Sequence, residues 1–174
     1  MSAKFEIRES RETELDAVKD IYSAVFPDEE LRPLVEALFH EPASVLSVVA
    51  YIDGEIVGHV AFTDCEVSDR AERVALLGPL AVAPDRHRQG IGSALIAEGR
   101  RLLADAGVAS LYVLGDPAYY SRFGFAPERA VQPPYPLPAE WRDAWQSLTL
   151  NAPAEPLSGE LRVPAVWAVP ELWG

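Results

Sequence analysis

The chain has 174 residues, which is long enough to bury a hydrophobic core. Its composition, 49% hydrophobic and 24% charged, is ordinary for a globular protein. Its formal net charge of −12 repels phosphate backbones and argues against nucleic-acid binding through the general surface. Its single cysteine, Cys65, excludes an internal disulfide, and we find neither a secretion signal nor an apolar run long enough for a bilayer, so we expect a cytoplasmic protein without a membrane partner.

Two helices are predicted early in the chain. Residues 4–8 have the pattern of a short strand. Thr13 then offers a hydroxyl that can cap a helix, and apolar residues recur at helical spacing until Pro27 ends that helix. Similar spacing marks a second helix over residues 31–38.

An antiparallel meander is predicted next. Its segments are rich in β-branched and apolar residues, and the Asp53-Gly54 pair is typical of a tight hairpin turn between the first two. The three strands are expected over residues 44–52, 55–64 and 74–83.

A strand–helix–strand crossover follows the meander. The spacing predicts a helix over residues 90–106, and Gly107 stands where a helix end favours a left-handed residue. A short strand is expected over residues 111–114. Because two strands joined through a helix in this way lie parallel, the third meander strand and this strand should form a parallel pair.

The remainder of the chain is rich in proline, and 9 of the 15 prolines lie in the last fifty residues. A short helix over residues 118–123 should stop at Gly124. Beyond it we expect irregular chain with one helix near 139–146 and short strands near 148–150 and 161–163. No segment is long enough to act as a linker, so a single domain over residues 1–174 is predicted.

The loop before the predicted crossover helix has the properties of an anion-binding site. The first N–H groups of a helix lack internal partners, and Gly90 and Gly92 leave room for a phosphate to approach the backbone. Leu95 stands where a dinucleotide-binding fingerprint needs a third glycine, and no Gly-Lys-Ser/Thr is present. A pair of glycines before a helix also occurs in plain tight turns, so the loop needs its context.

Two longer motifs supply that context. The segment Leu77–Leu95 resembles the signature strand, loop and helix of GNAT N-acetyltransferases. The segment Leu114–Phe125 is similar to a second signature of one bacterial branch, often labelled only as predicted N-acetyltransferases. The resemblance spans nearly the whole chain and implies an α/β (α+β) fold with a mixed, mostly antiparallel central sheet, a β–α–β crossover and helices on both faces.

The resemblance also implies acetyl-CoA as co-substrate, with no metal, and direct attack of a primary amine on the thioester. His87 departs from the family's Gln or Arg at the first loop position, although backbone contacts do not depend on that side chain. A backbone N–H between Leu80 and Val82 would serve the developing negative charge on the carbonyl oxygen. The residues assigned to acetyl-CoA are Leu80, Ala81, Val82, His87, Arg88, Gln89, Gly90, Ile91, Gly92 and Ser93.

Two catalytic residues are predicted. Tyr120 matches the family's tyrosine and would hydrogen-bond the departing thiolate, because a phenol is a weaker acid than a thiol. His59 is the candidate general base, since its ordinary pKa suits the task, although a lone histidine in an apolar strand is also a common core residue. Asp64 and Glu66 are alternatives acting through water, and Cys65 is interpreted as structural.

The acceptor amine cannot be read from the sequence. The resemblance implies that residues 26–40 and 130–145 select it, and acidic side chains at Asp28, Glu29, Glu30 and Glu36 favour a cationic amine. We also expect a homodimer, in which Trp141, Trp145, Trp167 and Trp173 would cover the surface between the two copies. The alternative functions are a non-catalytic acyl-CoA-binding protein, an acyltransferase with a larger acyl-CoA, and an anion-binding domain without a cofactor.

Overall fold

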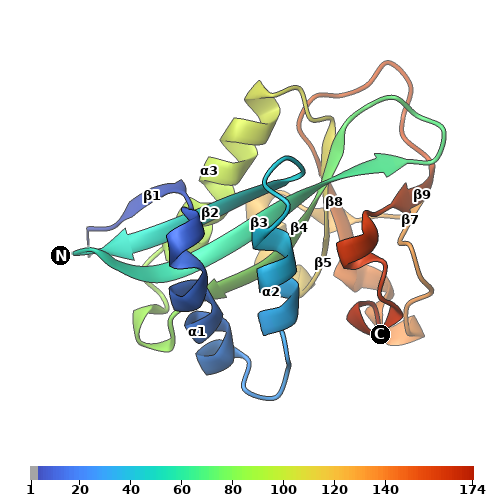
Figure 1. Ribbon diagram of the computed structural model, residues 1–174. Helices are drawn as coiled ribbons and strands as arrows, with labels where there is room; N and C mark the ends of the chain where they lie inside the picture. Colours follow the sequence, from blue (N-terminus) through green and yellow to red (C-terminus); the bar gives the residue numbers. More distant parts are fainter. Residues whose placement is uncertain (1–3) are drawn as a thin grey trace. The chain divides into compact units, whose positions relative to one another are not determined.

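The computed structural model describes residues 4–174 (Figure 1). These residues form two compact units. Unit 1 runs to Phe62 and resumes over Gly78–Arg101, and unit 2 holds Thr63–Leu77 and Leu102–Gly174. Two strands and one helix pass from one unit into the other along the chain. The single domain stays a prediction.

Unit 1 is built on strands in the order β1 (Glu6–Glu9), β2 (Val45–Ile52), β3 (Glu55–Val67) and β4 (Val74–Val82). β1 and β2 are antiparallel, with Glu6 opposite Tyr51. The β2–β3 turn is confirmed, because Asp53 and Gly54 both have positive φ, 50° and 80°, as a tight hairpin turn requires. The meander is therefore as predicted, although β3 continues three residues beyond the expected Asp64.

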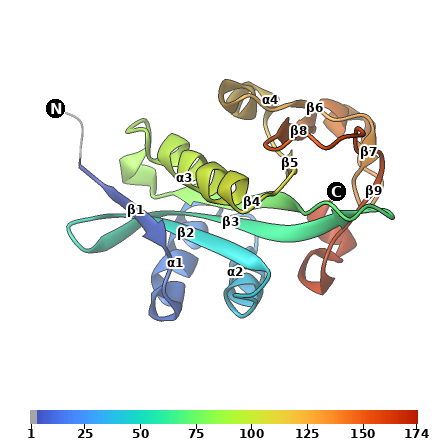
Figure 2. The ribbon, with the colours of Figure 1, turned by 90° about the horizontal axis from the view of Figure 1, so that it is seen from above.

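Helices cover both faces of the unit 1 sheet. Figure 2 shows α1 (Leu15–Val25) and α2 (Arg32–Phe39) on one face and α3 (Ile91–Asp105) on the other. The residues that bury the α1–α2 face are apolar and come from both helices and the strands: Val18, Ile21, Tyr22, Val35, Val49 and Ala81.

The predicted cap of the first helix is wrong. Thr13 lies inside a 3-10 turn, Glu12–Glu14, and the residue before α1 is Glu14, which makes no side-chain cap. The Glu14 carboxylate instead accepts hydrogen bonds from Arg8 at 2.6 and 2.9 Å and from the Arg11 amide at 2.7 Å. Those contacts of Glu14 hold the 3-10 turn before α1, in place of the predicted threonine cap.

Glycine allows α3 to pack closely on β3 within unit 1. A Cβ at Gly58 would lie 3.0 Å from Ile91 and 3.1 Å from Leu95. A Cβ at Gly99 would lie only 2.0 Å from the Phe62 ring. The helix and the strand can approach to this distance because neither glycine has a side chain.

Unit 2 confirms the crossover. β5 (Ser110–Leu114) pairs in parallel with Val74–Leu77 of β4, and antiparallel with β8 (Trp145–Thr149). β8 also pairs antiparallel with β6 (Ala126–Pro127). The last strand, β9 (Gly159–Arg162), pairs antiparallel with Glu66–Val67 of β3. It also pairs in parallel with the short strand β7 (Val131–Gln132). The fold is thus mixed α/β with a mostly antiparallel open sheet, as predicted.

The proline-rich part differs from its prediction in detail. The helix expected near 139–146 is a 3-10 helix that ends at Ala144, because Trp145 and Gln146 begin β8. The indole N–H of Trp145 donates to the Val131 carbonyl at 2.8 Å, and its ring stacks on Tyr112. These contacts hold Trp145 in a strand. The short helix α4 (Pro117–Tyr120) continues as a 3-10 turn that ends at Gly124, whose φ is 97°.

The tryptophans do not form the surface patch that a dimer was expected to use. Trp145 and Trp173 are each 2% exposed and Trp167 is 8% exposed, whereas Trp141 is 40% exposed. Three of the four rings belong to the core of unit 2, where they contact one another. Within residues 4–174, no helix is long and apolar enough to cross a membrane.

Candidate active site

The loop between β4 and α3 is anchored at its start by a side chain. A 3-10 turn, Pro84–Arg86, leads to His87, whose Nε2 lies 2.7 Å from the Val82 carbonyl oxygen. The imidazole N–H can donate to that oxygen, which fastens the loop to the end of its own strand. This contact gives His87 a structural use at the position where the resemblance implies Gln or Arg.

The following backbone has the conformation of an anion-binding loop. Arg88 and Gly90 both lie in the left-handed region, with φ of 64° and 80°. Left-handed residues among right-handed ones turn successive N–H groups toward one side. The first turn of α3 closes with Ala94 N donating to Gly90 O at 3.0 Å, so the preceding amides of the helix lack a helical acceptor.

Gln89 adds an unsatisfied acceptor to this loop. Its Oε1 is buried and makes no hydrogen bond in the described part of the chain. A buried amide oxygen without a donor is costly, so the position favours a ligand that brings an N–H or O–H. An orphaned acceptor beside free amides fits a bound group that contains both an anion and hydrogen-bond donors.

The last residues of β4 point their backbone N–H groups alternately to its two edges. The register with β5 ends at Leu77 opposite Val113, and Pro79 has no N–H. Ala83 N donates to Val57 O of β3 at 2.8 Å. Since antiparallel neighbours alternate, Ala81 also faces β3, while Leu80 and Val82 turn their amides to the opposite edge of β4.

Tyr120 lies in unit 2 on α4, where Asp116 caps the helix by accepting from Ala118 N at 2.9 Å. Its ring contacts Phe125 edge-on and covers Gly115, where a Cβ would lie 2.4 Å from the ring. Burial raises the pKa of the Tyr120 phenol well above its usual value. The hydroxyl therefore stays protonated at working pH and can act as a hydrogen-bond donor.

His59 has the surroundings of a core residue. It is 1% exposed, and both ring nitrogens are engaged, Nδ1 with the Tyr22 hydroxyl at 2.8 Å and Nε2 with Ser47 Oγ at 2.9 Å. Ser10 Oγ donates to Ser47 Oγ at 2.7 Å, which extends this buried hydrogen-bond chain from Tyr22 through His59 and Ser47 to Ser10. Burial lowers the pKa of His59 to about 3, so the ring is neutral.

The alternative bases predicted from the sequence, Asp64 and Glu66, lie near arginine residues. The Asp64 carboxylate is held by Arg73, with N···O distances of 3.0 and 3.1 Å. Glu66 stands opposite Arg162 in the β3–β9 pairing and is exposed. Cys65 is 5% exposed, and burial raises the pKa of its thiol to about 12, which supports a structural thiol.

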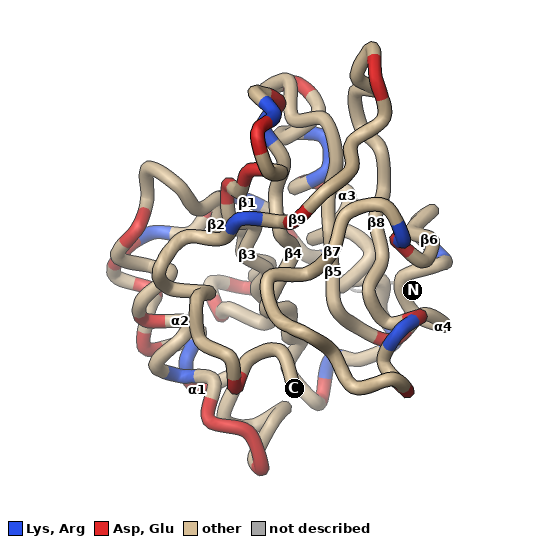
Figure 3. The backbone as a smooth tube through the Cα atoms, turned by 90° about the vertical axis from the view of Figure 1, so that its right-hand side faces the viewer, with Lys and Arg blue, Asp and Glu red and all other residues tan. Residues whose placement is uncertain are grey.

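The acidic side chains near the first helices are partly neutralised. Figure 3 shows the acidic run Asp28–Glu30 in the turn between α1 and α2. Glu30 forms an ion pair with Arg32 at 3.2 Å, and Glu36 lies 3.7 Å from Lys19. This leaves Asp28 and Glu29 as the carboxylates that carry the predicted preference for a cationic amine.

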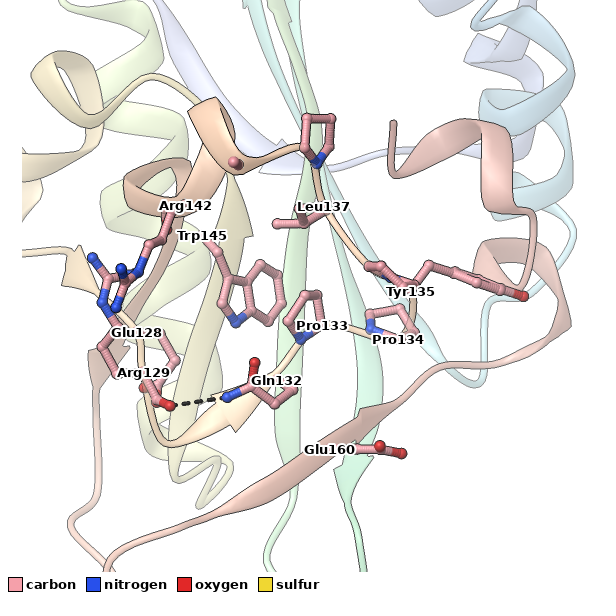
Figure 4. Close-up of a pocket in the computed structure, with 13 residues that line it drawn as sticks. Glu128, Arg129, Gln132, Pro133, Pro134, Tyr135, Leu137, Arg142, Trp145 and Glu160 are labelled. Atoms are coloured by element: carbon pink, nitrogen blue, oxygen red, sulfur yellow. Dashed lines mark hydrogen bonds between the residues drawn. The ribbon is translucent and has the colours of Figure 1, made fainter.

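A cavity of about 670 Å³ lies wholly in unit 2, beneath the proline-rich segment (Figure 4). Residues 130–145 were predicted to help select the acceptor only through the family resemblance. The high proline content of this segment is the local feature of the sequence that could have indicated a rigid cavity wall. Its lining mixes prolines, aromatic rings and charged side chains: Glu128, Arg129, Gln132, Pro133, Pro134, Tyr135, Pro136, Leu137, Pro138, Ala139, Arg142, Trp145 and Glu160. Residues 4–174 hold no group of three or more His, Cys, Asp or Glu that could hold a metal ion.

Comparison with known sequences gives a consistent result. Residues 15–125 match the acetyltransferase (GNAT) family. The uncharacterized N-acetyltransferase YjhQ of Escherichia coli K12 is 32% identical over 148 residues, which cover 82% of this chain and 76% of that protein. The uncharacterized N-acetyltransferase YhbS of the same strain is 37% identical over 101 residues, 58% of this chain and 60% of that protein.

Solved structures resemble this chain over nearly its full length. A GNAT family acetyltransferase from Brucella melitensis, crystallised with acetyl-CoA, has 30% identity and a TM-score of 0.76 over 94% of this chain and 98% of its own. YhbS from Escherichia coli, crystallised with CoA, has 26% identity and a TM-score of 0.86 over 97% of this chain and 94% of its own.

Proposed function

The chain belongs to the acetyltransferase (GNAT) family and is an acyl-CoA-dependent acyltransferase, and from that premise we propose that it transfers the acetyl group of acetyl-CoA to a primary amine by direct attack. The observation that carries the proposal is the loop Arg88–Ser93, where free amides, two left-handed residues and an orphaned amide oxygen lie together. Acetyl-CoA contributes the activated thioester.

In this proposal the backbone of the loop holds the diphosphate. The amides of Ile91, Gly92 and Ser93 point out of the first turn of α3, and the helix dipole adds positive potential there. Gly90 keeps the backbone accessible, because nothing in unit 1 approaches its missing side chain within 4 Å. His87 contributes by fixing the loop to Val82 rather than by its charge.

The free edge of β4 is proposed to stabilise the developing charge. Leu80 and Val82 turn their N–H groups away from β3, while the Ala81 amide is directed toward β3 by the alternation of the strand. A fixed backbone donor of this kind typically contributes a few kcal/mol to a transition state that carries negative oxygen. Of the three backbone N–H groups predicted to stabilise the negative carbonyl oxygen, those of Leu80 and Val82 are therefore the ones we propose.

Tyr120 keeps the role that the resemblance assigns to it, a hydrogen bond to the departing thiolate. A thiol has an ordinary pKa of about 8.5 and a phenol of about 10, so full proton transfer is uphill by about 2 kcal/mol. The raised pKa of Tyr120 increases that difference. We therefore propose that Tyr120 stabilises the thiolate as a donor and keeps its own proton, and that the proton lost by the attacking amine passes to water as CoA leaves as the thiolate.

His59 was predicted to be the base, and its surroundings support a positioning role. Its neutral ring joins α1 to β2 through Tyr22 and Ser47, with no nitrogen left for an amine. The two roles differ in the pH profile of kcat/KM. A base would make His59→Gln remove the acidic limb of the profile, whereas a positioning residue would leave that limb in place.

The direct test is thiol release from acetyl-CoA in the presence of polyamines, amino acids, aminoglycosides or peptide N-termini. We expect release that depends on the amine, and an increase in Tm on adding CoA alone. A Tm increase without release for any amine would favour a non-catalytic acyl-CoA-binding protein. Faster release from propionyl- or succinyl-CoA would favour a larger donor, and an unchanged Tm would refute cofactor binding.

A further inference from the structure

The cavity in unit 2 has rigid walls. Four prolines, at positions 133, 134, 136 and 138, line it, and their rings fix the backbone φ. Trp145 is held by its hydrogen bond to Val131 and by its contacts with Tyr112 and Trp173. A preformed cavity of about 670 Å³ is in the range that small molecules occupy, and its rigidity reduces the entropy lost on binding.

Some polar groups of the cavity are already used by the protein. The Glu128 carboxylate accepts from the amides of Ala130 and Val131 and from Ser147 Oγ, at 2.7–2.8 Å. The Arg129 guanidinium donates to the Arg142 carbonyl at 3.0 Å and pairs with Asp143. These contacts hold the segment after β6 in place, so Glu128 and Arg129 are occupied.

Other polar groups of the lining have no such partner. No hydrogen bond or ion pair within residues 4–174 engages the Arg142 guanidinium, the Glu160 carboxylate or the Tyr135 hydroxyl. Figure 4 shows Arg142 to one side of the Trp145 ring and Glu160, on β9, to the other side. A cation and an anion thus stand apart, with Trp145 and the prolines between them.

We propose that this cavity binds a small zwitterion with an apolar body, such as an apolar amino acid or a short peptide, with its carboxylate toward Arg142 and its ammonium toward Glu160. The lining contains two arginines and two glutamates. A ligand with only a negative charge is attracted by Arg142 and repelled by Glu160, and the reverse holds for a ligand with only a positive charge. A zwitterion satisfies both ends, and its apolar body lies against Leu137 and the lining prolines, next to the edge of Trp145.

Three ligands that share one phenyl body test this assignment. L-phenylalanine carries both charges, 3-phenylpropionate lacks the ammonium and 2-phenylethylamine lacks the carboxylate. Titration is followed by the indole N–H resonance of Trp145 without any acyl donor, so the result does not depend on acyl transfer. We expect L-phenylalanine to bind most tightly, with saturation of the Trp145 shift.

Two charge-removing variants then separate the ends of the cavity. Arg142→Gln should weaken L-phenylalanine and 3-phenylpropionate by about two- to fivefold, as for partly exposed ion pairs, and leave 2-phenylethylamine unchanged. Glu160→Gln should weaken L-phenylalanine and 2-phenylethylamine to a similar extent and leave 3-phenylpropionate unchanged. Arg162→Gln and Glu155→Gln are matched controls in unit 2 outside the lining, and they should leave all three affinities unchanged.

Several results would overturn the proposal. One is the absence of a saturable Trp145 shift with both L-phenylalanine and a phenylalanine dipeptide. Another is binding that the control variants weaken as much as Arg142→Gln and Glu160→Gln. Equal affinity for all three ligands would show that only the phenyl group is recognised.

Discussion

Gly99 offers a test in which two physical effects predict opposite signs. It lies in the middle of α3, where alanine is favoured over glycine by about 1 kcal/mol. Helix propensity alone therefore predicts that Gly99→Ala stabilises the protein. The packing predicts the reverse, because a Cβ at this position would lie 2.0 Å from Cε2 and 2.3 Å from Cζ of Phe62.

The magnitude follows from those distances. Phe62 is 1% exposed, so its ring has no free direction in which to turn, and the helix must move away from β3. Overpacking of a core typically costs about 1–3 kcal/mol, and a contact this short belongs to the upper part of that range. After the gain in helix propensity, we expect a net loss of about 1–2 kcal/mol in the free energy of unfolding, or about 2–8 °C in Tm.

The assay is urea and thermal unfolding of four variants. Ala97→Gly, at an exposed position of the same helix, calibrates the propensity effect. Phe62→Leu and the double variant Gly99→Ala/Phe62→Leu measure the coupling, and the double variant should lose less stability than the two single losses combined. If Gly99→Ala raises Tm by the amount that Ala97→Gly lowers it, the close packing of α3 on β3 is refuted.

Further predictions concern catalysis, the cofactor and pH. Tyr120→Phe should lower kcat more than it lowers affinity for acetyl-CoA, and Gly115→Ala should act alike because its Cβ would lie 2.4 Å from the Tyr120 ring; an unchanged kcat in both would remove Tyr120 from the mechanism. Gly92→Trp should abolish CoA binding measured by calorimetry, and unaltered affinity would contradict the loop assignment. The pKa of His59 is about 3 in the folded protein and about 6.5 when unfolded, so between these values the unfolded state binds more protons and stability falls as pH decreases, by up to about 1.4 kcal/mol per pH unit. In urea unfolding between pH 4 and 7, His59→Gln should show a shallower slope than the wild type, and equal slopes would refute a neutral buried His59.

Much of the backbone was predictable because its signals are local. Asp53-Gly54 forms the predicted hairpin turn, Gly107 is left-handed as predicted and Gly124 stops its helix as predicted, and all of these residues have positive φ. Such positions depend on the conformational freedom of one or two residues, which the sequence states directly. The glycine loop before α3 was found for the same reason, and two extended motifs led to the family.

What the sequence could not determine depends on contacts between distant residues. His59 meets Tyr22, 37 positions away, and burial in the packed interior gives the ring its lowered pKa. Trp145 was expected in a helix, but its pairing with Leu114 and its bond to Val131 place it in a strand. The arrangement of Arg142 and Glu160 around one cavity likewise has no local signature, because it arises only when β9 packs beside the proline-rich segment. Local preferences thus set the turns and the loop, while the surroundings of each functional side chain were decided by tertiary packing, which no short stretch of sequence encodes.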